Sequence, residues 1–168
     1  MLKAPLKTSQ ETYLAMSKQD RRLLLIGGVC QQYSILELRV AQIIWALLKI
    51  DEPTGKLVTS GLDILPRIRM AMRLATHLKA KPAVRKALEK VRTKLQDGVI
   101  DQRNLAVHGI QTVSDDGEVM TLEVHRGGKA NRQVPIRIAD LNALTRDIYE
   151  LTKLLDGEIP DFSAIIAK

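Results

Sequence analysis

Apolar residues recur three and four positions apart over residues 20–50 and fall into two neighbouring series: Ile26, Cys30, Tyr33, Val40, Ile44 and Leu47, and Leu25, Val29, Leu36 and Ile43. This spacing places side chains on adjoining stripes of one α-helix. Asp20 is a suitable N-cap, and the turn-forming residues 51–55 supply a stop. The pattern therefore predicts a long central helix that packs against more than one neighbour.

Two adjacent glycines, Gly27 and Gly28, interrupt this helix pattern. Each costs about 1 kcal/mol relative to alanine inside a helix. We expect them to mark a close approach of another helix or a kink. Residues 1–19 form an N-terminal extension in which Ser9 is a candidate cap for a short helix.

Three further helices are predicted from the same periodicity. The first spans about residues 55–78, with Pro66 near its start. The next spans 82–108, where Gly98 is expected to bend it or to divide it into 83–96 and 98–108. The last begins at the cap Asp140 and runs to about residue 155, before a tail at 157–168.

Between residues 110 and 138 the apolar period changes from helical spacing to two, as in Met120, Leu122 and Val124. Turn signals occur at 115–117 and 126–129, and Pro135 favours an edge strand. The chain is therefore expected to be one mainly α domain spanning residues 1–168. Its predicted architecture is a four- to five-helix up-down bundle with a small antiparallel β-meander inserted before the last helix.

The amino-acid composition also bears on the fold class and on the cellular location. Aromatic residues make up only 3% of the 168 residues, so the core must be aliphatic, which favours helices over a β-sandwich. The single cysteine, Cys30, excludes an intramolecular disulfide framework and is expected to be a small core residue. With no signal peptide pattern and no segment of about 20 apolar residues, we expect a cytoplasmic protein without membrane association.

The net charge of +7 is concentrated in residues 64–103, which hold eleven Lys and Arg residues against three acidic ones. Such a block suits RNA, DNA or a nucleotide. Residues predicted to contact nucleic acid are Arg67, Arg73, Lys81, Arg85 and Lys86. The alternative is a solvated helical face without a partner.

Three hydrogen-bonding side chains, Arg103, Asn104 and His108, stand at the end of the predicted helix before Gly109. Asn104 and His108 are one turn apart and share a face, with Arg103 on its flank. An arginine stabilises charge on phosphoryl oxygens, and a histidine moves a proton to or from an alcohol oxygen. No clustered metal ligands accompany them, so neither a metal nor another cofactor is implied. Capping of the helix end is the alternative.

Glu37 lies within the apolar series of the first helix. Burying a carboxylate costs several kcal/mol unless a partner satisfies it. One interpretation is an edge residue bonded to a nearby arginine. The other is a supporting residue that orients Arg103 and His108.

The sequence Arg103-Asn104-x-x-x-His108-Gly109 resembles the signature of the HEPN superfamily (higher eukaryote and prokaryote nucleotide-binding domain), an Arg, a polar residue, a spacer and a His near a helix end. Tyr33-Ser34-x-x-Glu37 is similar to a pattern of some bacterial members. The architectural likeness spans about residues 20–156, and the insert at 110–138 is longer than a minimal member needs.

The resemblance implies a metal-independent endoribonuclease with a role as a toxin or defence component. It would act as a homodimer whose two motifs face one another. His108 would handle the proton of the 2′-hydroxyl or of the leaving oxygen, Arg103 would bind the scissile phosphate, and Asn104 would position them. The product would carry a 2′,3′-cyclic phosphate. A cognate protein inhibitor is a further expected partner.

Two other readings stay open. Some HEPN members no longer cut and serve as dimeric modules that bind nucleotide, RNA or a protein partner. In a purely structural reading, Arg103, Asn104 and Glu37 form a satisfied polar network at a helix junction.

Overall fold

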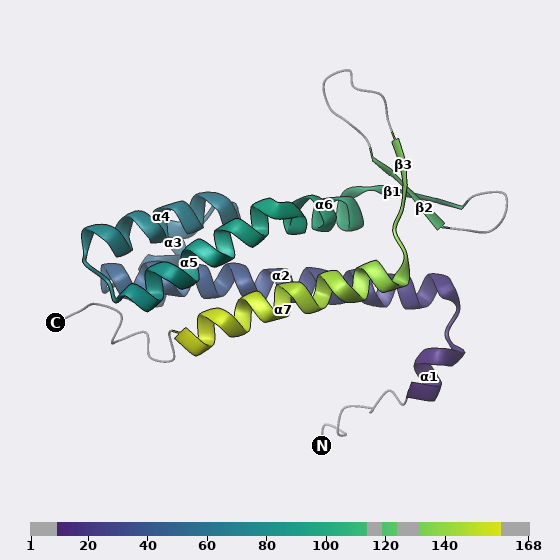
Figure 1. The fold of residues 1–168 in the computed structure, drawn as a ribbon, viewed down its shortest axis with the longest axis horizontal. Coiled ribbons are helices and arrows are strands. Elements are labelled where there is room, and N and C mark those ends of the chain that lie inside the picture. Colours follow the sequence, from purple (N-terminus) through teal and green to yellow (C-terminus); the bar gives the residue numbers. More distant parts are fainter. Residues whose placement is uncertain (1–9, 114–118, 124–131, 159–168) are drawn as a thin grey trace.

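The protein is a mainly helical bundle, seen in a computed structural model that describes residues 10–113, 119–123 and 132–158. Figure 1 shows long helices lying side by side, with a small sheet at one end. The elements are, in chain order, α1 (Gln10–Ala15), α2 (Lys18–Leu48), α3 (Glu52–Thr59), α4 (Ile64–His77), α5 (Pro82–Lys94), a π-helical turn (Leu95–Val99), α6 (Ile100–His108), β1 (Ile110–Val113), β2 (Val119–Glu123), β3 (Arg132–Pro135) and α7 (Ile138–Glu158).

Helix α2 is the central helix, and its start differs from the prediction. Its N-cap is Ser17, whose hydroxyl accepts a hydrogen bond from the backbone N–H of Asp20 at 3.0 Å. Asp20 therefore lies in the first turn, where a carboxylate is favoured by the helix dipole. The helix ends at Leu48, and its C-cap, Lys49, adopts a left-handed conformation with φ of 55°.

The helix predicted over residues 55–78 is wrong, because two helices occupy this region. Asp51 caps α3 by accepting the Thr54 N–H at 3.1 Å, so the predicted stop signal starts a new helix. Gly55 lies inside α3, and a Cβ there would come within 2.4 Å of the Trp45 ring. Gly61, with φ of 72°, separates α3 from α4.

Helices α2, α4, α5 and α7 enclose an aliphatic core. Helix α2 packs on α4 and α7, and α5 packs on the same two helices, so α4 and α7 lie diagonally across the bundle. The largest fully buried side chains are Leu36, Ile43, Ile44, Leu47, Ile68, Leu88, Leu95, Leu141, Ile148, Leu155 and Val29. Burying this apolar surface is the main stabilising contribution to the bundle.

The glycine pair in α2 does not have the predicted role. The helix continues through both residues without interruption. A Cβ on Gly27 would meet nothing within 4 Å, and one on Gly28 would reach Thr145 of α7 at 3.9 Å, an ordinary contact. Among the described residues, these glycines therefore mark neither a kink nor a close helix approach. Cys30 is half-buried rather than part of the core.

The break expected at Gly98 is confirmed. Gly98 has φ of 126° at the π-helical turn that joins α5 to α6. A side chain would be strained there, so glycine allows α6 to take a direction different from that of α5.

The strands pair antiparallel in the order β1-β2-β3, with Ile110 opposite Leu122 and Met120 opposite Pro135. Arg22 of α2 ties this sheet to the bundle. Its side chain is 4% exposed and donates hydrogen bonds to the carbonyl oxygen of Ile136 and, at 2.8 Å, to Oγ1 of Thr121. The predicted turns at 115–117 and 126–129, the candidate cap Ser9 and most of the tail lie outside the described residues.

Candidate functional site

The end of α6 is fixed by a close contact with the sheet. Gly109 follows α6 in an extended conformation, and its N–H bonds to the Leu105 carbonyl oxygen at 3.1 Å. A Cβ on Gly109 would lie 2.1 Å from Cγ2 of Thr121 and 2.5 Å from that carbonyl oxygen. Glycine is therefore required by the approach of β2. The helix thus ends without a left-handed residue at Gly109.

Arg103 contacts three other side chains near the end of α6. Its Nη1 donates to Oδ1 of Asn104 at 3.0 Å and contacts Nε2 of His108 at 2.9 Å. On the α2 side, its guanidinium carbon lies 4.7 Å from the centroid of the Tyr33 ring, within the range of a cation–π interaction. The structure thus brings together the three motif residues predicted from the sequence.

The contact between Arg103 and His108 fixes the role of one imidazole nitrogen. A guanidinium has only donors, so Nε2 of His108 must be the acceptor and must carry no proton in this arrangement. The proton of the neutral ring is then assigned to Nδ1. Nε2 therefore holds the lone pair that a general base needs, and Arg103 must move aside before a substrate hydroxyl can use it.

The motif borders a cleft of about 800 Å³ between α2, α4 and α6. Figure 1 shows these helices meeting near the middle of the molecule. The lining residues are Tyr33, Glu37, Asp63, Ile64, Leu65, Pro66, Arg69, Ile100, Arg103, Asn104 and His108. A cleft with cationic, amide and imidazole groups on an apolar wall can orient a polar ligand.

Glu37 lies in this cleft with the motif. Burial raises the pKa of the Glu37 carboxyl, an effect that Arg67 and Arg103 oppose and Asp63 reinforces. Arg67 therefore acts on Glu37 electrostatically, although it does not line the cleft. No hydrogen bond or ion pair of Glu37 is formed with either arginine among the described residues.

Tyr33 is a member of the site to which the sequence assigned no role, although it belongs to the apolar series and to the Tyr33-Ser34-x-x-Glu37 pattern. Burial and the nearby charge of Glu37 raise the pKa of its phenol to about 12, with Arg103 opposing the rise. The phenol is therefore neutral at physiological pH. Its position four residues before Glu37 was the available signal, since the two share one face of α2.

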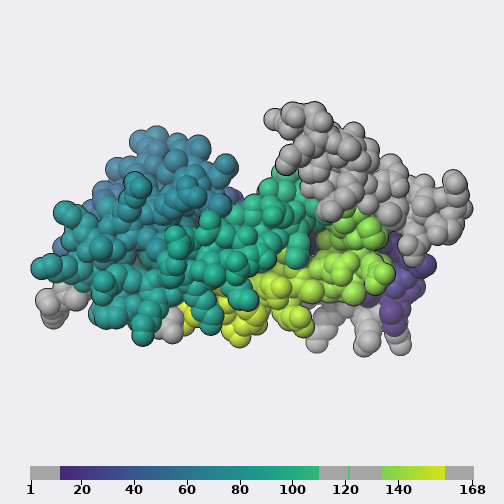
Figure 2. Space-filling view, turned by 45° about the horizontal axis from the view of Figure 1, so that its top comes forward, coloured from purple at the N-terminus to yellow at the C-terminus, as the bar shows by residue number. Residues whose placement is uncertain are grey.

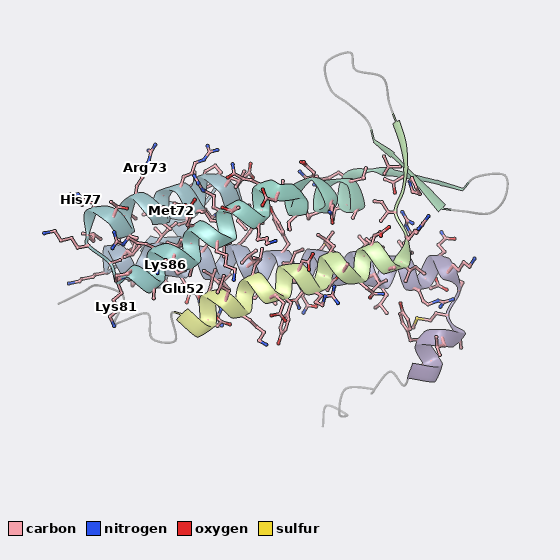
Figure 3. All side chains as sticks on the ribbon, viewed as in Figure 1. Glu52, Met72, Arg73, His77, Lys81 and Lys86 are labelled. Atoms are coloured by element: carbon pink, nitrogen blue, oxygen red, sulfur yellow. The ribbon has the colours of Figure 1, made fainter. Side chains whose placement is uncertain are left out.

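The residues predicted to bind nucleic acid are distributed differently from the motif. Figure 3 shows Arg73, Lys81 and Lys86 toward the end of the bundle where α4 and α5 meet. None of the five predicted residues lines the cleft, whereas Arg69, one turn before Arg73, does. Sequence spacing alone could not show which face of α4 turns toward α6.

The part of the chain that the structure describes contains no cluster of three or more His, Cys, Asp or Glu residues suited to a metal ion. Within the same residues, no helix has the length and apolarity needed to cross a membrane. Comparisons of this chain with models of protein families, with curated proteins and with solved structures return no match.

Proposed function

We propose that the protein is a metal-independent endoribonuclease of the HEPN type. The observation that carries this proposal is the contact of Arg103 Nη1 with both His108 Nε2 and Asn104 Oδ1 at the border of the cleft. This arrangement joins a proton acceptor, a cation and an amide within one hydrogen-bonded group. The HEPN resemblance of the motif supplies the reaction class.

In the proposed reaction, Nε2 of His108 takes the proton from a ribose 2′-hydroxyl. The 2′-oxygen attacks the adjacent phosphorus, and the bond from phosphorus to the 5′-oxygen of the next nucleotide breaks. The departing oxygen takes up a proton, and the other fragment ends in a 2′,3′-cyclic phosphate. The nucleophile belongs to the substrate, so the protein has to supply proton transfer and charge stabilisation.

Arg103 stabilises the negative charge that develops on the non-bridging phosphoryl oxygens. Its planar group offers two parallel N–H donors, which suits a phosphate better than a lysine does. The face of the Tyr33 ring contacts the guanidinium through a cation–π interaction and helps to hold it in place. Asn104 restrains the same group through its amide oxygen.

The proposal includes a homodimer in which a HEPN-like up-down arrangement of helices would bring the motifs of two copies to one cleft. In such a dimer, one His108 would act as base and the other could protonate the leaving oxygen. A cytoplasmic role in defence or as a toxin, with a cognate protein inhibitor, belongs to the same hypothesis.

The second candidate is a noncatalytic module that binds nucleotide, RNA or a protein partner in the same cleft. Two carboxylates, Glu37 and Asp63, line the cleft beside the cations, and they weaken its attraction for phosphates. Arg103 is also bonded to His108 and Asn104, as a structural polar network requires. Binding without strand cleavage would favour this candidate.

The discriminating experiment uses single-stranded RNA in EDTA with the wild type, His108→Ala and Gln102→Ala. Gln102 is an exposed neighbour on α6 that does not line the cleft, so its variant is the matched control. We expect cutting by the wild type and by Gln102→Ala and none by His108→Ala, with equal thermal stability. Equal cutting by all three proteins would refute the proposal.

A further inference from the structure

The hairpin formed by α4 and α5 carries the largest concentration of positive charge in the chain. Residues 64–94 contain ten Lys and Arg residues and one acidic residue, Glu89. Glu89 pairs with Arg92 of its own helix. Among the described residues, no other cation of this hairpin forms an ion pair. Apart from Arg67, which acts on Glu37, the remaining cations therefore have no acidic side chain close enough to neutralise them among the described residues.

The row of exposed cations along α4 starts at the cleft. Leu65, Pro66 and Arg69 of α4 line it. Arg73 follows Arg69 by four residues and is rotated from it by about 40°, so both lie on the same side of α4, about 6 Å apart along its axis. Both side chains are exposed. The cationic edge of the cleft therefore continues along α4 away from the motif.

The series continues to the end of the bundle. Figure 3 shows Arg73 and His77 along α4, with Lys81 and Lys86 following where the chain turns into α5. Lys81, Arg85 and Lys86 are exposed. Figure 2 shows the surfaces of α4 and α5 forming one end of the molecule. We call Arg69, Arg73, Lys81, Arg85 and Lys86 the α4–α5 track.

We propose that the α4–α5 track binds the phosphate backbone of a nucleic acid strand and leads it into the cleft. The identification of this strand as RNA rests on the proposed function. Charge attraction alone holds the backbone here, so binding along the track is independent of sequence. Few base contacts are expected, since α4 and α5 contain no Phe, Tyr or Trp and His77 is the one aromatic ring in these helices on which a base could stack.

The arrangement favours a strand over an anionic membrane or a phosphorylated peptide. One turn of α4 separates Arg69 from Arg73, a rise comparable with the spacing of successive phosphates on an extended strand. A peptide with a single phosphate would contact one or two of these cations, and the others would not add to its affinity. A membrane would engage the exposed end of the bundle without involving Arg69 in the cleft.

The strand's length should therefore determine which residues contribute to its binding. We expect a dinucleotide bound at Arg103 to leave Arg73 unoccupied, and a strand of about 15 nucleotides to contact both residues. Glu37 and Asp63 oppose phosphates inside the cleft, so the track should provide much of the affinity for a long strand.

The test measures binding of a 2′-O-methyl RNA strand of 15 nucleotides, which cannot be cut through its 2′-oxygen, by fluorescence anisotropy at several salt concentrations. The variant Arg73→Ala/Lys86→Ala removes two track cations outside the cleft. The control Arg146→Ala/Lys153→Ala removes two exposed cations from α7, which lies diagonally opposite α4. Both variants lose the same net charge.

For Arg73→Ala/Lys86→Ala we expect about tenfold weaker binding at low salt and a salt-dependence slope reduced in magnitude by about 1.4, from two lost phosphate contacts. The control should retain the wild-type slope, and a dinucleotide should bind all three proteins alike. An equal loss of affinity in both variants, or a loss in neither, would refute the proposal that the track binds the strand. Vesicles of anionic lipid that bind the wild type with the same dependence on Arg73 and Lys86 would overturn it in favour of a membrane surface.

Cleavage assays separate this inference from the proposed function. If the strand binds through the track but is never cut, the track stands and the nuclease proposal fails. If wild type and Arg73→Ala/Lys86→Ala bind and cut long RNA alike, the nuclease stands and the track fails.

Discussion

The guanidinium of Arg103 donates to Nε2 of His108 across 2.9 Å, and the same guanidinium lies over the ring of Tyr33. The contact couples the group that would accept a proton to the group that would stabilise charge. Because the arginine offers only donors, Nε2 is the acceptor in this contact. In the proposed reaction, Arg103 would have to release Nε2 before the imidazole could accept a proton.

Replacing Arg103 with lysine tests whether the planar guanidinium matters beyond its charge. Lysine keeps the positive charge but loses the paired donors and the stacking on Tyr33. We expect RNA cleavage in EDTA to fall by at least about 100-fold, the scale of losing one charge-stabilising donor. Single-turnover rates measure this. Arg146→Lys on α7 is the control, and an unchanged rate for Arg103→Lys would contradict the assigned role.

The raised pKa of Tyr33 predicts a distinct step in the ultraviolet titration of the tyrosines. The chain has three tyrosines, and that of Tyr33 should ionise near pH 12. Tyr33→Phe should remove this late component and leave the earlier absorbance change intact. A late component that persists in Tyr33→Phe would show that another phenol is the buried one.

The Glu37 carboxyl should make stability depend on pH in a defined direction. Its pKa is raised in the folded state, chiefly by burial, so its contribution to stability is fully present below its ordinary pKa of 4.5 and is lost as pH rises through the folded value. Glu37→Gln cannot ionise and should therefore raise the Tm above that of wild type at pH 7.5.

At pH 4 the difference between Glu37→Gln and wild type should disappear, because the wild-type carboxyl is then protonated. Thermal unfolding followed by circular dichroism at the two pH values measures this. Glu150→Gln, an exposed change on α7, is the control. A lower Tm for Glu37→Gln at pH 7.5 would mean that attraction to Arg67 and Arg103 outweighs burial.

Two alanine substitutions at glycines should have opposite effects. Gly109→Ala places a Cβ against Thr121 and the Leu105 carbonyl, and we expect a loss of about 2 kcal/mol or more in unfolding free energy. Gly27→Ala meets nothing within 4 Å and should add about 1 kcal/mol through helix propensity. Chemical denaturation measures both. A destabilised Gly27→Ala would point to a contact made on that face by another molecule.

Local signals predicted much of the helical content. The spacing Leu141, Leu144, Ile148, Leu151 and Leu155 gave α7, and each of these residues is buried. Gly98 marked the break before α6, because its positive φ is a local property. The start of α2 was misplaced because Ser17 and Asp20 are both good caps, and only the formed hydrogen bond distinguishes them.

The site was only partly accessible from the sequence. Arg103, Asn104 and His108 are close in the chain, so their helical spacing anticipated their proximity. The stacking of Arg103 on Tyr33 and the effect of Arg67 on Glu37 join separate helices, and no local pattern encodes them. The division at Gly61 was missed, and with it the orientation of α4 that brings Arg69 to the cleft.

The central claim is that the ribose 2′-oxygen is the nucleophile and His108 its base. The most direct measurement compares two oligonucleotides of one sequence, all-ribose and all-deoxyribose, incubated with the protein in EDTA, with fragment ends identified by mass spectrometry. We predict cutting of the ribose strand alone, 2′,3′-cyclic phosphate ends, and no cutting by His108→Ala. Cutting of the deoxyribose strand, or ribose fragments with a free 3′-hydroxyl, would contradict the account.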